Sequence, residues 1–305
     1  MNKSFIITVD TEGDNLWEWK EGQLITTENS RFIPYFQELC EEFGFIPTYL
    51  TNYEMAMDNR WIEYGKRKVT EKKCEIGLHI HAWNSPPFYK LEKNFSGHPY
   101  ISEYPEHIVS EKITKLAKLL REKFECDITR ARSGRWATND DYFMALTTNG
   151  IKVDCSVTPG LNLSGIQGYS KNLGNDYTRV LYKPYMIYEG IMEVPMSIKK
   201  VRWLAEGSAK HRIKSLIIGE QMWLRPHKGS RNYLKVLTDS LVKENRYLEF
   251  MIHSSELMPK GSPYFQSEEQ IKQLYELLRW YFEYIASMGY NGIGLSDFAR
   301  ENKEK

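Results

Sequence analysis

Near its start the chain reads Phe5-Ile6-Ile7-Thr8-Val9-Asp10-Thr11-Glu12, an apolar run that ends in two acids. Short apolar runs rich in β-branched and aromatic residues are typical of buried strands. Because side chains alternate along a strand, Asp10 and Glu12 should share one face, just where the apolar run ends. The stretch therefore predicts a buried strand with two carboxylates at its C-terminal end.

The same rhythm of short apolar runs and amphipathic helices continues along the chain. Further strands are predicted at 46–50, 74–81, 129–133, 153–157, 193–198, 247–252 and 292–295. Helices are predicted at 30–43, 106–124, 139–149, 230–244 and 267–288. Strand and helix alternating about seven times favours a parallel (β/α) barrel of about seven strands, distorted or incompletely closed. A doubly wound open sheet is the alternative.

Two long stretches break this rhythm. Residues 83–103 contain the paired prolines Pro86 and Pro87, and residues 158–189 are rich in Gly, Asn and Tyr without a clear period. Long loops in such domains usually shape the mouth of an active site. A chain of 305 residues without a linker or repeat is simplest to interpret as one domain, 1–305.

Composition narrows the class of protein. Charged residues make up 27% and hydrophobic residues 41%, which indicates a globular protein. The net charge of +1 gives no electrostatic reason to expect a nucleic-acid partner. Four widely spaced cysteines without a CxxC pair fit reduced thiols, and no segment reads as a signal peptide or an integral membrane span. A cytoplasmic protein is expected.

Polar side chains capable of metal binding and proton transfer stand at three strand ends. His79 and His81 share a face of one predicted strand, and His253 ends another. The C-terminal ends of strands are where parallel barrels assemble their chemistry. Two imidazoles and the carboxylate of Glu12 would form a three-ligand metal set with open positions. Asp10 could then act as base, and His253 could protonate a leaving group.

Each of these motifs taken singly has an ordinary structural explanation. A lone His-x-His pair is as often a pair of hydrogen-bonded structural histidines as a metal site, and an Asp-x-Glu at a strand end is commonly a turn acid or a helix cap. Taken together they favour function, because three separate strands end in the same class of residue.

Four segments in this order resemble the polysaccharide deacetylases, a carbohydrate esterase family. They are Thr8-Val9-Asp10-Thr11-Glu12, then residues 75–83 (EIGLHIHAW), 132–136 (RSGRW) and 251–257 (MIHSSEL). The resemblance runs from about Phe5 to Phe298 and implies the removal of acetyl groups from chitin-like, peptidoglycan or lipopolysaccharide-type sugars. The subgroup that the chain most resembles acts on bacterial surface polysaccharides such as O-antigen.

The resemblance also implies roles for individual residues. Asp10 matches the general base, Arg132 the residue that orients it, and His253 the general acid; Glu12, His79 and His81 match the metal ligands; Trp83, Trp136 and Leu257 match the substrate-binding positions; Asp154 resembles the acid of a further motif. In one respect the chain departs from the family, whose two metal histidines are usually four residues apart rather than two. Strand geometry lets both reach one ion, and the alternative is that one of them binds substrate.

The expected activity is therefore metal-dependent hydrolysis of an N-acetyl group from an amino sugar of a bacterial surface polysaccharide or its precursor. The substrate would be a carbohydrate, free or carried on a lipid or nucleotide. The cofactor would be one divalent ion, zinc, with cobalt, nickel, iron or manganese as alternatives. Two other functions stay open, a metal-independent C–N amide hydrolase and a non-catalytic glycan-binding module. No role is assigned to His98. Arg225 is assigned to a solvated surface, with contact to a phosphate or an acidic sugar as the alternative, and Trp223 is assigned to either a cleft or the core.

Overall fold

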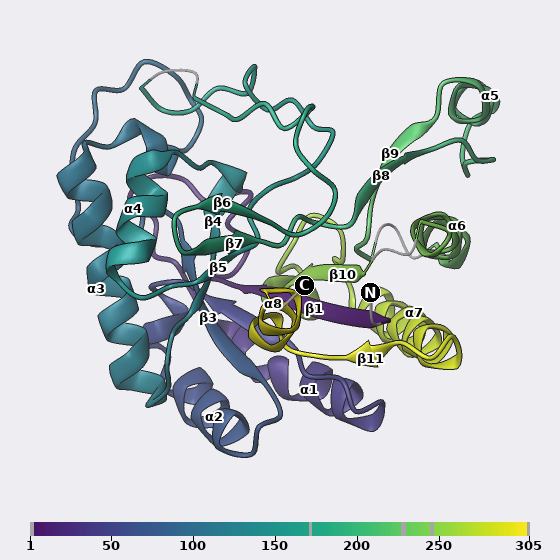
Figure 1. The fold of residues 1–305 in the computed structure, drawn as a ribbon, viewed down its shortest axis with the longest axis horizontal. Coiled ribbons are helices and arrows are strands. Elements are labelled where there is room, and N and C mark those ends of the chain that lie inside the picture. Colours follow the sequence, from purple (N-terminus) through teal and green to yellow (C-terminus); the bar gives the residue numbers. More distant parts are fainter. Residues whose placement is uncertain (1–2, 171–172, 227–229, 245–246, 304–305) are drawn as a thin grey trace.

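The computed structural model describes residues 3–170, 173–226, 230–244 and 247–303 (Figure 1). Its main sheet curls into a barrel-like wall, and a separate two-stranded hairpin projects from it. The strands are β1 (Ser4–Thr11), β2 (Thr48–Thr51), β3 (Glu75–Ile80), β4 (Arg130–Ser133), β5 (Val153–Asp154), β6 (Tyr185–Tyr188), β7 (Ile191–Glu193), β8 (Ile198–Val201), β9 (Glu220–Trp223), β10 (Leu248–His253) and β11 (Asn291–Gly292).

The strand order confirms a distorted, incompletely closed parallel barrel. It runs β10-β1-β2-β3-β4-β5-β7-β6, and among the described residues every neighbouring pair on this path is parallel except β6 with β7. In a doubly wound sheet the strand order proceeds from the first strand to one edge and then, after a crossover, from the first strand to the other edge. Here the strands follow the chain order around the wall, so the doubly wound alternative is wrong.

The barrel is open between β7 and β10, where a single strand was predicted over 193–198. That prediction is wrong because Pro195 has no N–H to give to a ladder, so β7 ends at Glu193 and the chain resumes strand pairing only in β8. The gap is bridged by the backbone of Leu224, whose N–H donates to the Ser197 carbonyl and whose carbonyl accepts from the Met251 N–H, and by side chains. The backbone N–H of Glu249, for example, donates to Ser197 Oγ over 2.9 Å.

Helices cover the outside of the wall (Figure 1). They are α1 (Ile33–Glu42), α2 (Asn59–Thr70), α3 (Glu106–Phe124), α4 (Asp140–Thr148), α6 (Arg231–Val242) and α7 (Glu268–Ser287). Two further helices lie elsewhere: α5 (Ala209–Ile217) projects with β8 and β9, and α8 (Leu295–Lys303) packs against inward-facing residues at the amino ends of the strands. The five predicted helices are all present within a few residues. The predicted last strand, 292–295, is too long: β11 ends at Gly292 and Leu295 already begins α8. The long loop predicted at 158–189 contains β6 near its end.

Alternation along β1 separates two apolar layers. Phe5 and Ile7 face outward into the core between strands and helices, whereas Ile6 faces inward and packs in a cluster with Phe298 of α8. The next inward residue, Thr8, begins a polar layer, because its hydroxyl donates to a buried carboxylate. The barrel is thus filled with apolar side chains at the amino ends of its strands and with polar ones toward their carboxyl ends.

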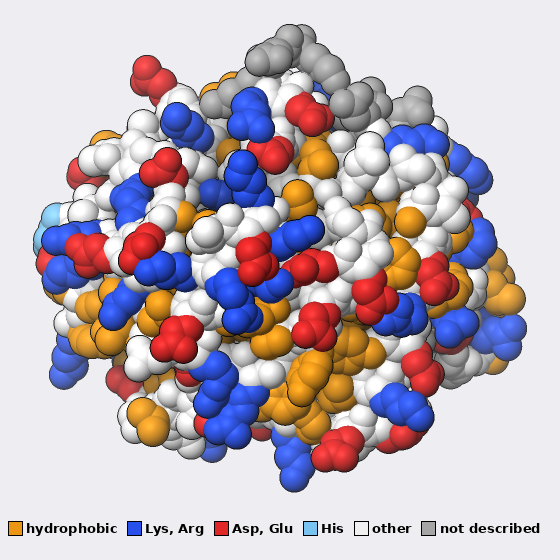
Figure 2. All heavy atoms as spheres, turned by 90° about the horizontal axis from the view of Figure 1, so that it is seen from below, with side chains coloured by type: hydrophobic (Ala, Val, Ile, Leu, Met, Phe, Trp, Pro, Cys, Tyr) orange, Lys and Arg blue, Asp and Glu red, His pale blue; other side chains and the backbone are white. Residues whose placement is uncertain are grey.

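Three further observations concern the chain as a whole. The face seen from below carries acidic and basic side chains side by side, with apolar ones between them (Figure 2). All four cysteines are free. None of the helices within the described ranges has both the length and the apolar character needed to span a bilayer.

Candidate metal-binding and catalytic site

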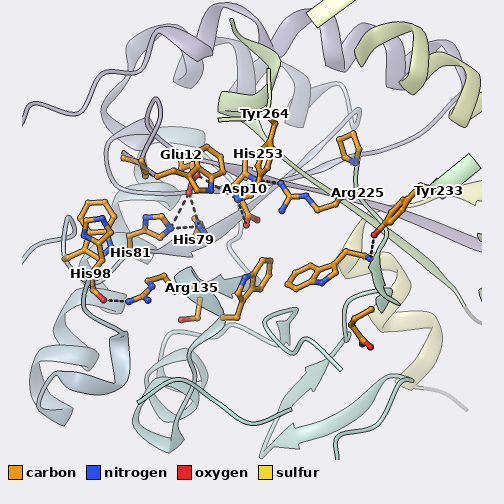
Figure 3. A pocket seen from close by; sticks show the side chains of 18 of the residues that line it. Asp10, Glu12, His79, His81, His98, Arg135, Arg225, Tyr233, His253 and Tyr264 are labelled. Carbon is orange, nitrogen blue, oxygen red and sulfur yellow. Dashed lines mark hydrogen bonds and ion pairs between the residues drawn. The ribbon is translucent and has the colours of Figure 1, made fainter. Parts of the chain in front are cut away.

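A cavity of about 580 Å³ opens at the carboxyl ends of the parallel strands (Figure 3). Chemistry in parallel barrels is assembled at this end because several strand termini and their loops converge there. The lining combines titratable and aromatic side chains, among them Asp10, Glu12, His79, His81, Trp83, Trp136 and His253. Seven of the ten residues given roles from the sequence therefore line one cavity; Arg132, Leu257 and Asp154 are not among the described residues that line it.

Glu12, His79 and His81 converge on a single point. The Nε2 atoms of the two histidines are 3.0 Å apart, and they lie 3.6 Å (His79) and 3.3 Å (His81) from Glu12 Oε2. One nitrogen or oxygen from each residue lies within 4.8 Å of the others, so one cation could contact all three. Two imidazoles and a carboxylate are the donor set of many catalytic zinc sites, which keep a further position open for water. The spacing of two residues is thus no obstacle to shared ligation.

The surroundings of the two imidazoles favour ligation in different ways. Nδ1 of His79 lies 3.1 Å from the carbonyl oxygen of Arg132, and donating there leaves Nε2 with its lone pair toward Glu12. Burial lowers the pKa of His81 well below its ordinary range, and the nearby His79 lowers it further, which favours the neutral ligand form. For His79, burial alone would lower the pKa, but Asp10 and Glu12 raise it.

A glycine beside His81 makes room for this arrangement. A Cβ placed on Gly134 would lie 2.1 Å from His81 Cδ2 and 2.8 Å from its Nε2. The backbone that follows β4 therefore passes directly against the imidazole, and any larger residue at position 134 would have to displace it. The following residues, Arg135 and Trp136, have φ values of 56° and 60°. Left-handed conformations are costly for such side chains and often mark functional loops.

Asp10 belongs to a buried ion-pair network. Arg132 Nη1 lies 2.6 Å from Asp10 Oδ1, and its Nη2 lies 2.5 Å from Glu249 Oε1. Burial by itself would raise the pKa of Asp10, but the charge of Arg132 overcomes it and lowers that pKa to about 2. Burial raises the pKa of Glu249 to about 7 despite the same arginine. Asp10 is therefore the ionised partner, with Oδ2 left to face the cavity.

His253 faces Asp10 from the neighbouring strand. The register of β1 with β10 pairs these two residues, and His253 Nε2 lies 3.9 Å from both Asp10 Oδ2 and Glu12 Oε1. On its other side, His253 Nδ1 lies 3.5 Å from Glu256, which also accepts the His253 backbone N–H over 3.0 Å and pairs with Arg225 at 2.6 Å. Burial by itself would raise the pKa of Glu256, but the charge of Arg225 outweighs burial and lowers that pKa to about 2. A carboxylate thus backs the imidazole.

Aromatic rings form the cavity walls. Trp83 stacks between Trp19 and His98, with ring centroids 4.6 Å and 4.7 Å away. The ring of Trp136 lies over the Arg132 guanidinium at 5.2 Å and meets Trp223 edge-on. Flat apolar faces around a polar floor suit a ring-shaped ligand with hydroxyl groups.

Leu257, expected at a substrate-binding position, and Asp154, expected as the acid of a further motif, both lie outside the cavity lining. Leu257 ends the short helix η5 (Ser254–Leu257) and is buried in the core between strands and helices, so it is not among the described residues that line the cavity. Asp154 also lies outside this lining, because its carboxylate is used internally. It accepts the Tyr142 hydroxyl over 2.8 Å and the Ser156 N–H over 3.0 Å.

Several cavity residues are not recognised from the sequence. Arg225, assigned to a solvated surface, is buried against Glu256, and His98 and Tyr264 also line the cavity. Trp223, for which a cleft and the core were both expected, lines the cavity. The sequence does offer one signal for Glu256, the carboxylate that binds Arg225. Glu256 follows His253 by three residues, which is the spacing of a capping contact. His98 and Tyr264 come from loops whose path across the cavity leaves no periodic pattern in the sequence.

No family model and no curated protein matches the chain. Solved structures do share its fold. One is a protein predicted to be a polysaccharide deacetylase from Mycobacterium smegmatis, with a TM-score of 0.56 and 12% identity over 99% of this chain and 91% of that one. Another is a 4-alpha-glucanotransferase from Thermococcus litoralis, with a TM-score of 0.54 and 13% identity over 99% of this chain but 38% of that one. At these identities the likeness shows the fold, and the chemistry has to be argued from the site.

Proposed function

We propose that the protein is a metal-dependent deacetylase that removes the N-acetyl group from an amino sugar of a bacterial surface polysaccharide or its precursor. The observation that carries the proposal is the convergence of Glu12, His79 and His81 beside an ionised Asp10 and a carboxylate-backed His253. A ligand set, a base and an acid within one cavity are what amide hydrolysis needs. The choice of an acetylated sugar rests on the sequence resemblance and on the aromatic walls.

A divalent cation bound by Glu12, His79 and His81, with zinc the preferred candidate, would act as a Lewis acid that polarises the acetamide carbonyl and activates water. Asp10 Oδ2 takes the proton from the attacking water, because Arg132 keeps this carboxylate ionised and fixed. His253 faces the same space and donates a proton to the departing amine, giving acetate and a free amino sugar. Glu256 positions the His253 ring for that transfer.

Acetate release from a panel of N-acetylated sugars tests this function. The proposal predicts release by the wild type, loss in Asp10→Asn, and recovery after chelation only when a divalent metal is returned. Asp127→Asn, at an exposed position, is the matched control and should behave as wild type. Undiminished release in chelator would instead support a metal-independent C–N hydrolase. Sugar binding without any acetate release would support a glycan-binding module.

A further inference from the structure

Helix α5 stands apart from the barrel. It connects β8 to β9, and Figure 1 shows it at the outer end of that hairpin, away from the other helices. Among its residues Ser215 alone is buried, where the hydroxyl donates to the Trp203 carbonyl over 2.8 Å and ties the helix to the hairpin. Almost the whole surface of α5 therefore faces outward.

The outward surface carries an apolar stripe. Ile213, Leu216 and Ile217 are 58%, 47% and 65% exposed, and their spacing of three and four residues places them on one face of the helix. Leu204 and Ile218, which flank the helix, are about half exposed as well. Large apolar side chains gathered on one projecting element mark an interaction surface.

Basic side chains border this stripe on both sides. At 3.6 residues per turn, Arg212 falls on one edge of the stripe, and Lys210 and Lys214 fall on the other. Between residues 199 and 220 there are six Lys or Arg against two Glu, an excess of four positive charges, whereas the whole chain carries a net charge of +1. Positive charge is thus concentrated around the one projecting apolar helix.

We propose that α5 docks the protein on an anionic lipid surface, with its apolar stripe in the interface and its basic edges at the headgroups. A short helix with an apolar face and Lys or Arg beside it has the character of an interfacial helix that lies in the membrane plane. An acidic protein partner would satisfy the charges, but it would not need the apolar side chains to project so far from the body. The lipid surface accounts for both features.

The position of α5 ties docking to the candidate site. Glu220, Gln221 and Trp223, on the strand that leaves α5, line the cavity that holds Asp10 and the histidines. A helix held at a bilayer would therefore bring the cavity wall close to the headgroups. Membrane binding itself does not depend on the proposed deacetylase activity, so the two can fail separately.

Cosedimentation with extruded vesicles tests the proposal. We expect the wild type to bind vesicles containing about a quarter phosphatidylglycerol more tightly than pure phosphatidylcholine vesicles, and to be released by salt. Ile213→Ser with Ile217→Ser should weaken partitioning by about tenfold or more. Lys210→Glu with Lys214→Glu should weaken it by about fivefold or more per residue on anionic vesicles.

Matched controls lie on exposed positions of other helices. Met144→Ser on α4 and Lys118→Glu on α3 should bind as wild type does. Circular dichroism melting checks the fold of each variant, and Leu204→Ser with Leu216→Ser serves as a second apolar pair if the first unfolds. The proposal is overturned if the wild type does not bind anionic vesicles, or if both apolar double variants bind them as tightly as the wild type does. A dimer in sedimentation velocity that Ile217→Ser abolishes would also overturn it, in favour of a second copy.

Discussion

The Nε2 atoms of His79 and His81 lie 3.0 Å apart, and both face Oε2 of Glu12. Nitrogen atoms this close can share one proton or one cation, and the buried carboxylate beside them favours either positive occupant. The ring of His79 is fixed by its contact with the Arg132 carbonyl, and the ring of His81 is confined by Gly134. Both rings therefore face one point before any ion binds, as the ligands of a metal site must.

Gly134→Ala should weaken metal binding. The new Cβ would lie 2.1 Å from His81 Cδ2 and 2.8 Å from the Ile80 carbonyl oxygen, so the ring has to turn away from Glu12 and the backbone has to shift slightly. Circular dichroism melting checks that the variant is folded. We expect a loss of about tenfold or more in metal affinity, comparable to the removal of a contact that orients a ligand. Competition with a chelator of known affinity gives the measurement. Gly165→Ala, where an added Cβ meets nothing within 4 Å, should bind metal like wild type. Equal affinities for the two variants would contradict the steric account.

Arg132→Met should destabilise the fold strongly. The substitution leaves Asp10 and Glu249 buried without their shared cation, and breaking a buried ion pair from one side typically costs about 3–5 kcal/mol. Urea unfolding at neutral pH measures this loss. The control Arg279→Met removes an exposed ion pair with Glu42 and should have a much smaller effect, because solvent already screens that pair. A loss for Arg132→Met no larger than that of the control would show that the network does not stabilise the fold.

Asp10 should contribute to the acid sensitivity of the metal-free protein. Its pKa is lowered from 3.8 to about 2 in the folded state, so the stabilisation is complete above about pH 4 and is lost as the pH falls toward 2. That shift corresponds to about 2 kcal/mol. The difference in unfolding free energy between wild type and Asp10→Asn should therefore shrink by about this amount between about pH 5 and pH 2. A difference that stays constant over this range would mean that Asp10 has an ordinary pKa.

His253→Ala should slow turnover while leaving metal content unchanged. The side chain lies 3.9 Å from Asp10 and from Glu12, close to the ligand set but outside it. Loss of a general acid typically lowers the rate by about 10²–10⁴-fold and removes one limb of the pH–rate profile. His211→Ala, at an exposed position, is the control for loss of a histidine. Normal turnover and an unchanged pH profile in His253→Ala would remove this residue from the mechanism.

Most of the fold was predictable from the arrangement of apolar residues along the chain. β1 is a continuous apolar run, β3 alternates between polar and apolar residues, and α3 places its apolar residues at helical spacing, so all three were located within a residue or two. Helix α2 was missed although Trp61, Ile62 and Val69 lie on one of its faces and pack against the core. Helix α5 was missed although Ile213, Leu216 and Ile217 recur at helical spacing, because that face is exposed and the segment is short and basic.

Some residues of the candidate site could likewise be predicted from the sequence, and others could not. Asp10, Glu12, His79, His81 and His253 could be named because each stands at the end of a strand, and strand alternation fixes the face to which it points. Arg225 and Leu257 could not be placed, because their positions depend on how loops fold back over the barrel. Arg225 comes to lie beside Glu256, and Leu257 turns into the core, and neither outcome leaves a local pattern.

Metal content measured by elemental analysis tests the central claim most directly. Wild type, His79→Ala, His81→Ala and the exposed control His211→Ala would each be reconstituted with zinc and freed of excess metal. The account predicts about one ion per chain in wild type and control, and loss of the ion in both ligand variants. An ion retained in one ligand variant would give that histidine a substrate role instead. No bound metal in reconstituted wild type would contradict the account.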